Sequence, residues 1–141
     1  MWSKKILIYT DGACRGNRGP CSIGLQVFGI NQDLIYEESA YLEDNNTNNF
    51  AEYKAVIRAL ELSVKHQVQD LTLFSDSQFL VYQMQNKYKV KTASIKKLFD
   101  ECKLFIKQIP RVQFKWIPRD KNKGADLLAN QALDQMKNKK F

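Results

Sequence analysis

Apolar and polar positions alternate along the chain in short runs, and most runs end at a cluster of turn-forming residues. Five runs show the two-residue alternation or the compact apolar block that is typical of β-strands. The turn GINQD separates the second run from the third, which indicates that the two are joined directly. The predicted strands span residues 5–10, 21–28, 34–42, 70–76 and 112–118.

Helical periodicity appears after the third predicted strand. Apolar residues recur at i, i+3, i+4, i+7 and i+11 from Tyr53 to Val64, which predicts an amphipathic helix after a loop over EDNNTNN. A later helix has Ser94 as its expected N-cap and Pro110 as its stop. The predicted helices span residues 53–64, 77–87, 95–109 and from about 124 onward.

The order of these elements predicts the fold class. The first three strands follow one another directly and are expected to form an antiparallel meander. Each later strand is followed by a helix, which favours parallel pairing through right-handed crossovers. The sequence therefore predicts an α/β fold with one five-stranded mixed sheet and helices packed on its faces. We expect residues 1–141 to form one domain, with a core from about 5 to 135 and a short lysine-rich tail.

Composition limits the function classes. Hydrophobic residues make up 44% of the chain and charged residues 26%, as in soluble globular proteins. No apolar run reaches the roughly 18 residues of a membrane span, so we expect no membrane partner. The apolar stretch after MWSKK stops at Asp11 without a small-residue cleavage site, which argues against a signal peptide. Three cysteines without a CxxC pair favour a reduced, cytoplasmic location.

Positive charge is concentrated in one part of the chain. The net charge is +7, and residues 87–123 alone hold 12 Lys and Arg against 3 Asp and Glu. A basic half beside a slightly acidic half suggests a polyanionic partner such as nucleic acid. A solvated, lysine-rich surface would give the same composition, so charge alone leaves both readings open.

Four carboxylates lie at the ends of predicted elements. Asp11 ends the first strand and Asp76 the fourth, and the two converge if these strands are neighbours, because carboxyl ends of parallel strands meet in one crevice. Glu52 and Asp126 lie in the first turns of two helices and can point toward the same crevice. Taken singly, each acid could be a turn or capping residue, and Asn49 with Glu52 is close to a capping box.

Taken together, the four acids indicate a metal centre. Converging carboxylates repel one another unless cations neutralise them. All-oxygen ligands favour Mg²⁺, with Mn²⁺ as a substitute, whereas one histidine and no paired cysteines disfavour zinc. Four carboxylates suffice for two ions roughly 3.5–4 Å apart, the arrangement used in phosphodiester hydrolysis. We therefore expect an enzyme that cleaves a polyanion.

Four motifs carry a resemblance to a known family. YTDGACRGNRGP, TNNFAEY, LTLFSDSQ and KGADLLAN, in that order, resemble the type 1 ribonuclease H family over roughly residues 5 to 135. The resemblance implies a ribonuclease H-like fold with strands 1–3 antiparallel and strands 4 and 5 added in parallel. It implies Mg²⁺-dependent endonucleolytic cleavage of the RNA strand of RNA–DNA hybrids, leaving 5′-phosphate and 3′-hydroxyl ends. It also implies the metal-binding and catalytic residues Asp11, Glu52, Asp76 and Asp126.

The resemblance further implies contacts with substrate. Asn17 matches a substrate-binding asparagine of the first loop, and Thr47 matches a residue that grips a DNA phosphate. Asn48 and Gln78 match positions that touch the RNA strand near its 2′-hydroxyls. Contact with the 2′-hydroxyl is how a protein distinguishes RNA from DNA at one site.

The first loop adds expectations of its own. We expect Cys14 and Arg15 to join the substrate contacts, with Arg18 adding a further phosphate contact. We also expect Cys14 and Cys21 to be small unpaired residues rather than a disulfide.

Two departures from the family pattern change the expected mechanism. Many members carry a histidine between the last strand and the last helix, whereas this chain has PRDKNKG there. Arg119 and Lys121 are the expected electrostatic substitutes, since His66 falls at the far, exposed end of the first long helix. The basic, tryptophan-containing insertion of some members is also missing, and a connector rich in lysine takes its place.

Three other readings remain open from the sequence. A two-metal nuclease of the same fold could act on double-stranded RNA. A catalytically weak or inactive module could bind hybrid or double-stranded RNA without cutting. A sheet protein whose acids merely cap helices would need no nucleic acid. We expect a monomer in each case.

Overall fold

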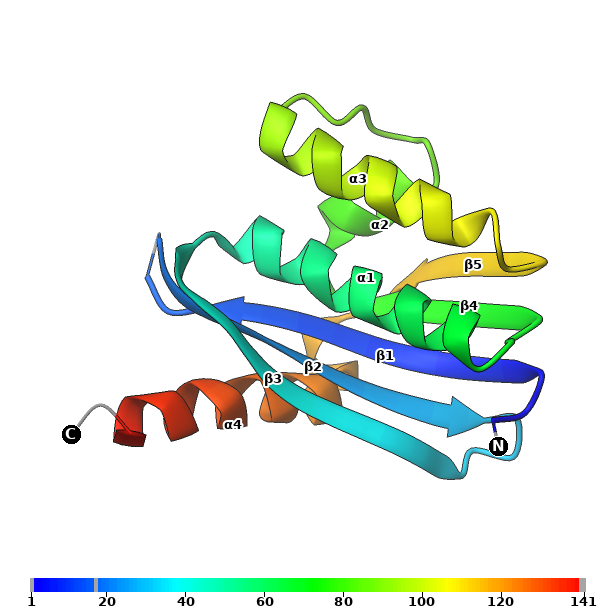
Figure 1. Ribbon diagram of the computed structural model, residues 1–141, viewed down its shortest axis with the longest axis horizontal. Helices are drawn as coiled ribbons and strands as arrows, with labels where there is room; N and C mark the ends of the chain where they lie inside the picture. The colour runs from blue at the N-terminus through cyan, green and yellow to red at the C-terminus, as the bar shows by residue number, and fades with distance from the viewer. Residues whose placement is uncertain (1, 17, 140–141) are drawn as a thin grey trace.

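The computed structural model describes residues 2–16 and 18–139, and its helices lie on both faces of one sheet (Figure 1). The strands are β1 (Lys5–Cys14), β2 (Gly19–Gly29), β3 (Leu34–Asn46), β4 (Asp70–Ser75) and β5 (Arg111–Trp116). The helices are α1 (Asn48–Lys65), α2 (Gln78–Met84), α3 (Ala93–Ile106) and α4 (Lys123–Lys139), and a 3₁₀ turn, η1, spans Arg119–Lys121. The predicted order of elements is confirmed.

The sheet has the predicted mixed topology. Its strand order is β3-β2-β1-β4-β5, with β1, β2 and β3 antiparallel and with β4 and β5 added in parallel beside β1. The parallel pairing of β1 with β4 ends at Tyr9 and Phe74. Asp11 and Asp76 each follow two residues later, so both emerge at the same end of neighbouring strands.

The main core lies between the sheet and α1, on the face that α2 and α3 also cover, while α4 packs on the opposite face (Figure 1). Apolar side chains of β1, β2 and β4 point into this core because alternate residues of a strand face the same side. The largest fully buried apolar side chains are Ile6, Ile8, Leu25, Leu60, Leu71, Leu73 and Leu80. No helix in the described residues is long and apolar enough to cross a membrane.

Two glycines allow helices to approach the sheet closely beside Asp11. A Cβ on Gly12 would lie 2.3 Å from the carbonyl oxygen of Ala51 in α1, and a Cβ on Gly24 would lie 2.2 Å from that of Ala125 in α4. Gly24 is also the residue that pairs with Asp11 across β1 and β2. Only glycine therefore permits the start of each helix to lie against the sheet at the level of this carboxylate.

Several predicted boundaries are wrong, among them the ends of β1 and β3 and the start of α3. β1 continues to Cys14, so Asp11 lies within a strand and only the parallel pairing ends before it. β3 continues to Asn46, since pairing with β2 overrides the polar composition of EDNN. The N-cap of α3 is Thr92 instead of Ser94, and it makes no side-chain capping hydrogen bond.

The expectation that Cys14 and Cys21 are unpaired is also wrong. The two residues lie opposite each other in β1 and β2, with Cα atoms 4.1 Å apart, and they form a disulfide. Sequence could not indicate this pair, because it depends on the register of the hairpin. Cys102 is the free cysteine among the described residues and is buried. The cysteine count therefore no longer supports a reduced location.

Replacement of Gly24 by alanine should destabilise the protein strongly. The new Cβ would meet backbone atoms of α4, which cannot move without displacing the helix, so we expect a loss of about 2–3 kcal/mol in the free energy of unfolding, as for other overpacked sites. Gly29→Ala in the same strand is the matched control. Its Cβ would meet only the end of the Asp33 side chain, so its cost should stay below about 1 kcal/mol. Equal urea midpoints for the two variants would contradict this account.

Candidate metal and nucleic-acid site

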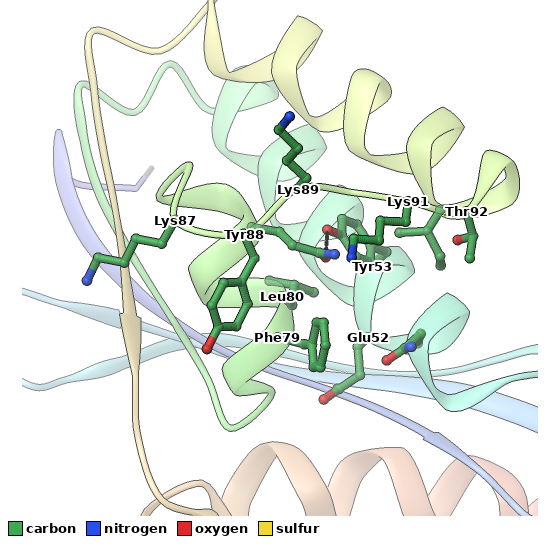
Figure 2. A pocket seen from close by; sticks show the side chains of 12 residues that line it. Glu52, Tyr53, Phe79, Leu80, Lys87, Tyr88, Lys89, Lys91 and Thr92 are labelled. Carbon is green, nitrogen blue, oxygen red and sulfur yellow. Dashed lines mark hydrogen bonds between the residues drawn. The ribbon is translucent and has the colours of Figure 1, made fainter.

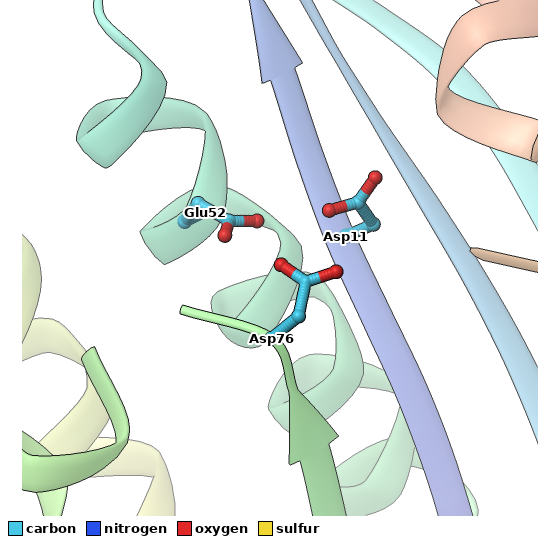
Figure 3. Close-up of side chains that lie close together, drawn as sticks. All are labelled: Asp11, Glu52 and Asp76. Carbon is cyan, nitrogen blue, oxygen red and sulfur yellow. The ribbon is translucent and has the colours of Figure 1, made fainter. Parts of the chain in front are cut away.

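Three acidic side chains converge where β1, β4 and α1 meet, and Figure 3 shows them pointing toward one another. Asp11 comes from β1, Glu52 from α1, and Asp76 directly follows β4. One carboxylate oxygen of each lies within 4.8 Å of the others. A cavity of about 160 Å³ opens beside them. The structure thus brings together three of the four acids predicted to bind metal.

Glu52 is held in place by β1. Its Oε1 accepts a hydrogen bond of 2.5 Å from the Gly12 N–H, across the close approach that this glycine permits. The N-cap of α1 is Thr47, whose Oγ1 accepts from the Phe50 N–H at 3.3 Å. Thr47 therefore replaces the capping box that Asn49 and Glu52 suggested, and the Glu52 carboxylate faces the other acids.

Asp126 lies at the border of the three-carboxylate group. It comes from the first turn of α4, and its carboxyl group neighbours that of Asp11. Arg119 Nη2 lies 3.6 Å from Asp126 Oδ1, and Asn130 Nδ2 donates to the same oxygen at 3.3 Å. Asp126 thus adjoins Asp11 but does not belong to the three acids whose oxygens lie within 4.8 Å of one another.

Burial and crowding make two of these acids hard to ionise. Burial, the charges of Glu52 and Asp76 and a hydrogen bond with Asp126 together raise the pKa of Asp11 to about 9. Burial also raises the pKa of Glu52, to about 8, while the hydrogen bond from Gly12 and the charge of Arg119 oppose the shift. Each carboxylate would become easier to ionise if a cation lay between them.

The donor set fits a hard divalent cation. All candidate ligands are carboxylate oxygens, which Mg²⁺ and Mn²⁺ prefer. Asp11 is only 5% exposed, so water can screen its charge little. A bound cation would supply the positive charge that neutralises these carboxylates.

Two residues predicted to touch RNA lie near this group. Asn48 lines the same cavity as the carboxylates, and its Oδ1 accepts a 3.0 Å hydrogen bond from the Cys14 N–H. Cys14 therefore orients Asn48 through its backbone, while its sulfur is in the disulfide. Gln78 is exposed at the start of α2, and its Nε2 donates to the Tyr82 hydroxyl at 3.1 Å. Contact of these residues with substrate stays a prediction.

Thr47 lies at a second, basic cavity. This cavity has a volume of about 660 Å³ and lies between the starts of α1 and α3. Three cations line it together with Thr47: Arg18, Lys54 and Lys97. Their positive charges suit a phosphate group, as the resemblance implied for Thr47.

The remaining predicted contacts lie in the first loop. Arg15 reaches α4, where its Nη2 lies 2.5 Å from Asp134 Oδ1. This ion pair would have to open before Arg15 could bind a phosphate. Asn17 lies outside the described residues.

Of the two expected substitutes for histidine, Arg119 lies beside the carboxylates. It lines their cavity, whereas Lys121 lines a different cavity on the α4 face of the sheet. His66 caps the far end of α1 and is half-buried, because its ring stacks on Trp2 at a centroid distance of 4.0 Å. This position excludes His66 from the site.

A groove extends from Glu52 along α2 and the connector to α3 (Figure 2). Its volume is about 560 Å³. Phe79 and Tyr88 are 63% and 47% exposed, and their ring centroids lie 5.5 Å apart. Three lysines also line it: Lys87, Lys89 and Lys91. We call this surface the lysine–aromatic groove. Exposed rings and lysines together suit a sugar–phosphate backbone.

Sequence reasoning missed Asn122, a fully buried residue at this site. Its Nδ2 donates to Asp76 Oδ2 at 3.1 Å and to the Thr10 carbonyl oxygen at 2.8 Å. The available signal was an asparagine four residues before Asp126, at the expected start of a helix. The exposed aromatic side chains of the groove, Phe79 and Tyr88, were missed as well.

Comparison with known proteins identifies the family. A family model described as reverse transcriptase-like matches residues 9–132. A protein named Ribonuclease H from Pseudomonas savastanoi pv. phaseolicola is 32% identical over 157 residues, covering 96% of this chain and 97% of that protein. The chain belongs to the ribonuclease H family. This assignment confirms the predicted resemblance.

A solved structure and a further curated relative also resemble this chain. The structure of LC11-RNase H1 in complex with an RNA/DNA hybrid has a TM-score of 0.88 and 40% identity, covering 94% of this chain and 99% of that chain. Bifunctional protein Rv2228c of Mycobacterium tuberculosis is 35% identical over 130 residues, covering 92% of this chain. The chain spans 36% of the length of that curated relative.

The metal-free ribonuclease H domain should lose stability as pH rises from about 4 to about 9. The folded-state pKa of Asp11 lies above its ordinary value of 3.8, so the folded state binds more protons across this window and deprotonation destabilises it. Asp11→Asn resembles the protonated acid. We expect it to raise the thermal midpoint in EDTA at pH 8 by roughly 3–8 °C.

The matched control is Asp120→Asn, in the exposed turn η1. It should leave both the midpoint at pH 8 and its pH dependence unchanged. A wild-type midpoint in EDTA that climbs between pH 5 and pH 9 would show that the acids are not protonated in the fold.

Proposed function

We propose that this chain is a divalent-metal-dependent endoribonuclease that cuts the RNA strand of RNA–DNA hybrids. The observation that carries the proposal is the convergence of Asp11, Glu52 and Asp76 within 4.8 Å, beside a groove lined with lysine. Membership of the ribonuclease H family supports the same reaction, as does the hybrid bound by LC11-RNase H1.

The acidic residues have one shared role in this proposal. Asp11, Glu52 and Asp76 would hold the cation, and Asp126 would complete the site from the first turn of α4. Bound Mg²⁺ ions, two in our proposal with Mn²⁺ as a substitute, supply the charge that activates water and stabilises the leaving oxygen. Such a reaction leaves a 5′-phosphate and a 3′-hydroxyl. The protein itself contributes carboxylate oxygens, of which those of Asp11 are buried and the others half-buried.

Arg119 places a cationic side chain beside the carboxylates. Its guanidinium can turn from Asp126 toward a scissile phosphate, because the side chain is 79% exposed. Guanidinium groups stabilise the negative charge that builds up during phosphoryl transfer. Arg119 would thus replace the electrostatic part of the role that a histidine has in other family members.

Different residues around the carboxylates would bind the two strands of the hybrid. Asn48 and Gln78 offer both donors and acceptors to 2′-hydroxyl groups, which favours contact with the RNA strand. The lysine–aromatic groove and the basic cavity at Thr47 offer positive charge to the phosphates of the DNA strand. The lysines of the connector to α3 would thereby supply the positive charge that the basic insertion supplies in some family members.

Wild-type protein should cut labelled RNA–DNA hybrid in the presence of Mg²⁺ or Mn²⁺ and should not cut in EDTA. Asp11→Asn should lower the cleavage rate by at least about 1,000-fold, because the central ligand loses its charge. Asp120→Asn, an exposed neutralisation with the same change in net charge, should keep the wild-type rate. Double-stranded RNA and double-stranded DNA serve as parallel substrates.

The other possible functions predict different results in this assay. Hybrid binding that weakens with salt but gives no cleavage under any metal would identify a binding module. Cleavage of double-stranded RNA in preference to hybrid would change the substrate class. Neither binding nor cleavage would leave the acids with a structural role only.

Arg119→Ala should slow hybrid cleavage by roughly 10- to 100-fold at saturating substrate, since one phosphate-facing charge is lost. Lys121→Ala is the matched control, because it removes a cation of the same turn that faces another cavity. It should change the rate by less than about twofold. Equal losses in the two variants would indicate general electrostatic attraction of nucleic acid instead of a specific role for Arg119.

A further inference from the structure

Asn122 is a polar residue buried between the elements that carry the acidic side chains. It is 1% exposed and lies between η1 and α4. Its Nδ2 donates to Asp76 Oδ2 at 3.1 Å and to the Thr10 carbonyl oxygen at 2.8 Å. A single amide group thus contacts one acid directly and the residue before another.

The backbone of Asn122 extends this connection to the fourth acid. Its carbonyl oxygen accepts the first hydrogen bond of α4, from the Asp126 N–H at 3.1 Å. Asn122 therefore occupies the capping position of the helix whose first turn presents Asp126. The side chain and the backbone together connect Asp76, Asp126 and the segment of β1 that holds Asp11.

Stability alone does not account for an asparagine here. Its Oδ1 is buried and has no hydrogen-bond partner in the described part of the protein. An unpaired buried acceptor is unfavourable for folding, and an apolar residue would avoid it. α4 is also anchored independently, since the Ser22 hydroxyl in β2 donates to the Ala129 carbonyl oxygen at 2.5 Å.

We infer that Asn122 is a positioning residue of the metal centre, and that it holds Asp76, Asp126 and the Asp11 segment in the arrangement that binds a divalent cation. The bond to Oδ2 fixes the rotation of the Asp76 carboxylate and leaves Oδ1 free of this contact. Residues behind metal ligands set ligand orientation in this way. The inference rests on the proposed metal-dependent function.

The test measures cation binding without nucleic acid. Calorimetry with Mn²⁺ compares the wild-type protein with Asn122→Ser, whose side chain suits the start of a helix but is too short to reach Asp76. We expect the variant to bind Mn²⁺ roughly 10- to 100-fold more weakly. With hybrid substrate, kcat should fall by a similar factor while KM changes less than about twofold.

Ser22→Ala is the matched control, because it loosens α4 from the sheet without touching an acid. It should bind Mn²⁺ with an affinity within about twofold of the wild type, whatever its thermal midpoint. Should Asn122→Ser be unfolded, the same titration is carried out in trimethylamine N-oxide, which restores compact states.

Wild-type affinity for Mn²⁺ in folded Asn122→Ser, or an equal loss in Ser22→Ala, would overturn the inference and leave the proposed function intact. Absence of Mn²⁺ binding in the wild-type protein would instead reject the proposed function, and this inference with it. A selective loss in Asn122→Ser would support both.

Discussion

Repulsion between three crowded carboxylates, one buried and two half-buried, is the constraint on which the rest of this structure depends. Three acids from β1, β4 and α1 share a space in which their oxygens lie within 4.8 Å, and Asp11 is almost inaccessible to water. Water would screen these charges outside the fold, but burial removes that screening. Without a cation, the proximity of these acids is unfavourable. The same proximity makes them a favourable binding site for a divalent cation.

Backbone packing maintains this arrangement against the repulsion. Gly12 and Gly24 let α1 and α4 contact opposite faces of the β1–β2 pair at the level of Asp11. Donors then hold individual oxygens, the Gly12 N–H at Glu52 and the Asn122 amide at Asp76. Gly12 lies in β1 and Asn122 is buried between η1 and α4, so close packing fixes both donors in place.

Sequence patterns predicted the sheet topology and four converging acids, three of which the structure brings together, because these features depend on alternation, helical periodicity and strand adjacency. They did not predict features that depend on register or on contacts between distant segments. The Cys14–Cys21 disulfide requires the exact pairing of a hairpin. Gly12 belonged to an apparent loop, since glycine composition does not distinguish a turn from a strand that a helix approaches closely. Asn122 resembled an ordinary polar loop residue.

The turn η1 separates two cations that the sequence could not tell apart. Arg119 and Lys121 are two positions apart, and in a 3₁₀ turn such residues point to different sides. One therefore faces the carboxylates and the other a cavity on the α4 face of the sheet. Arginine keeps its charge at every pH at which proteins stay folded. Under the proposed function, its position therefore provides phosphate-facing charge but no proton transfer, so the acids themselves must determine how the rate depends on pH.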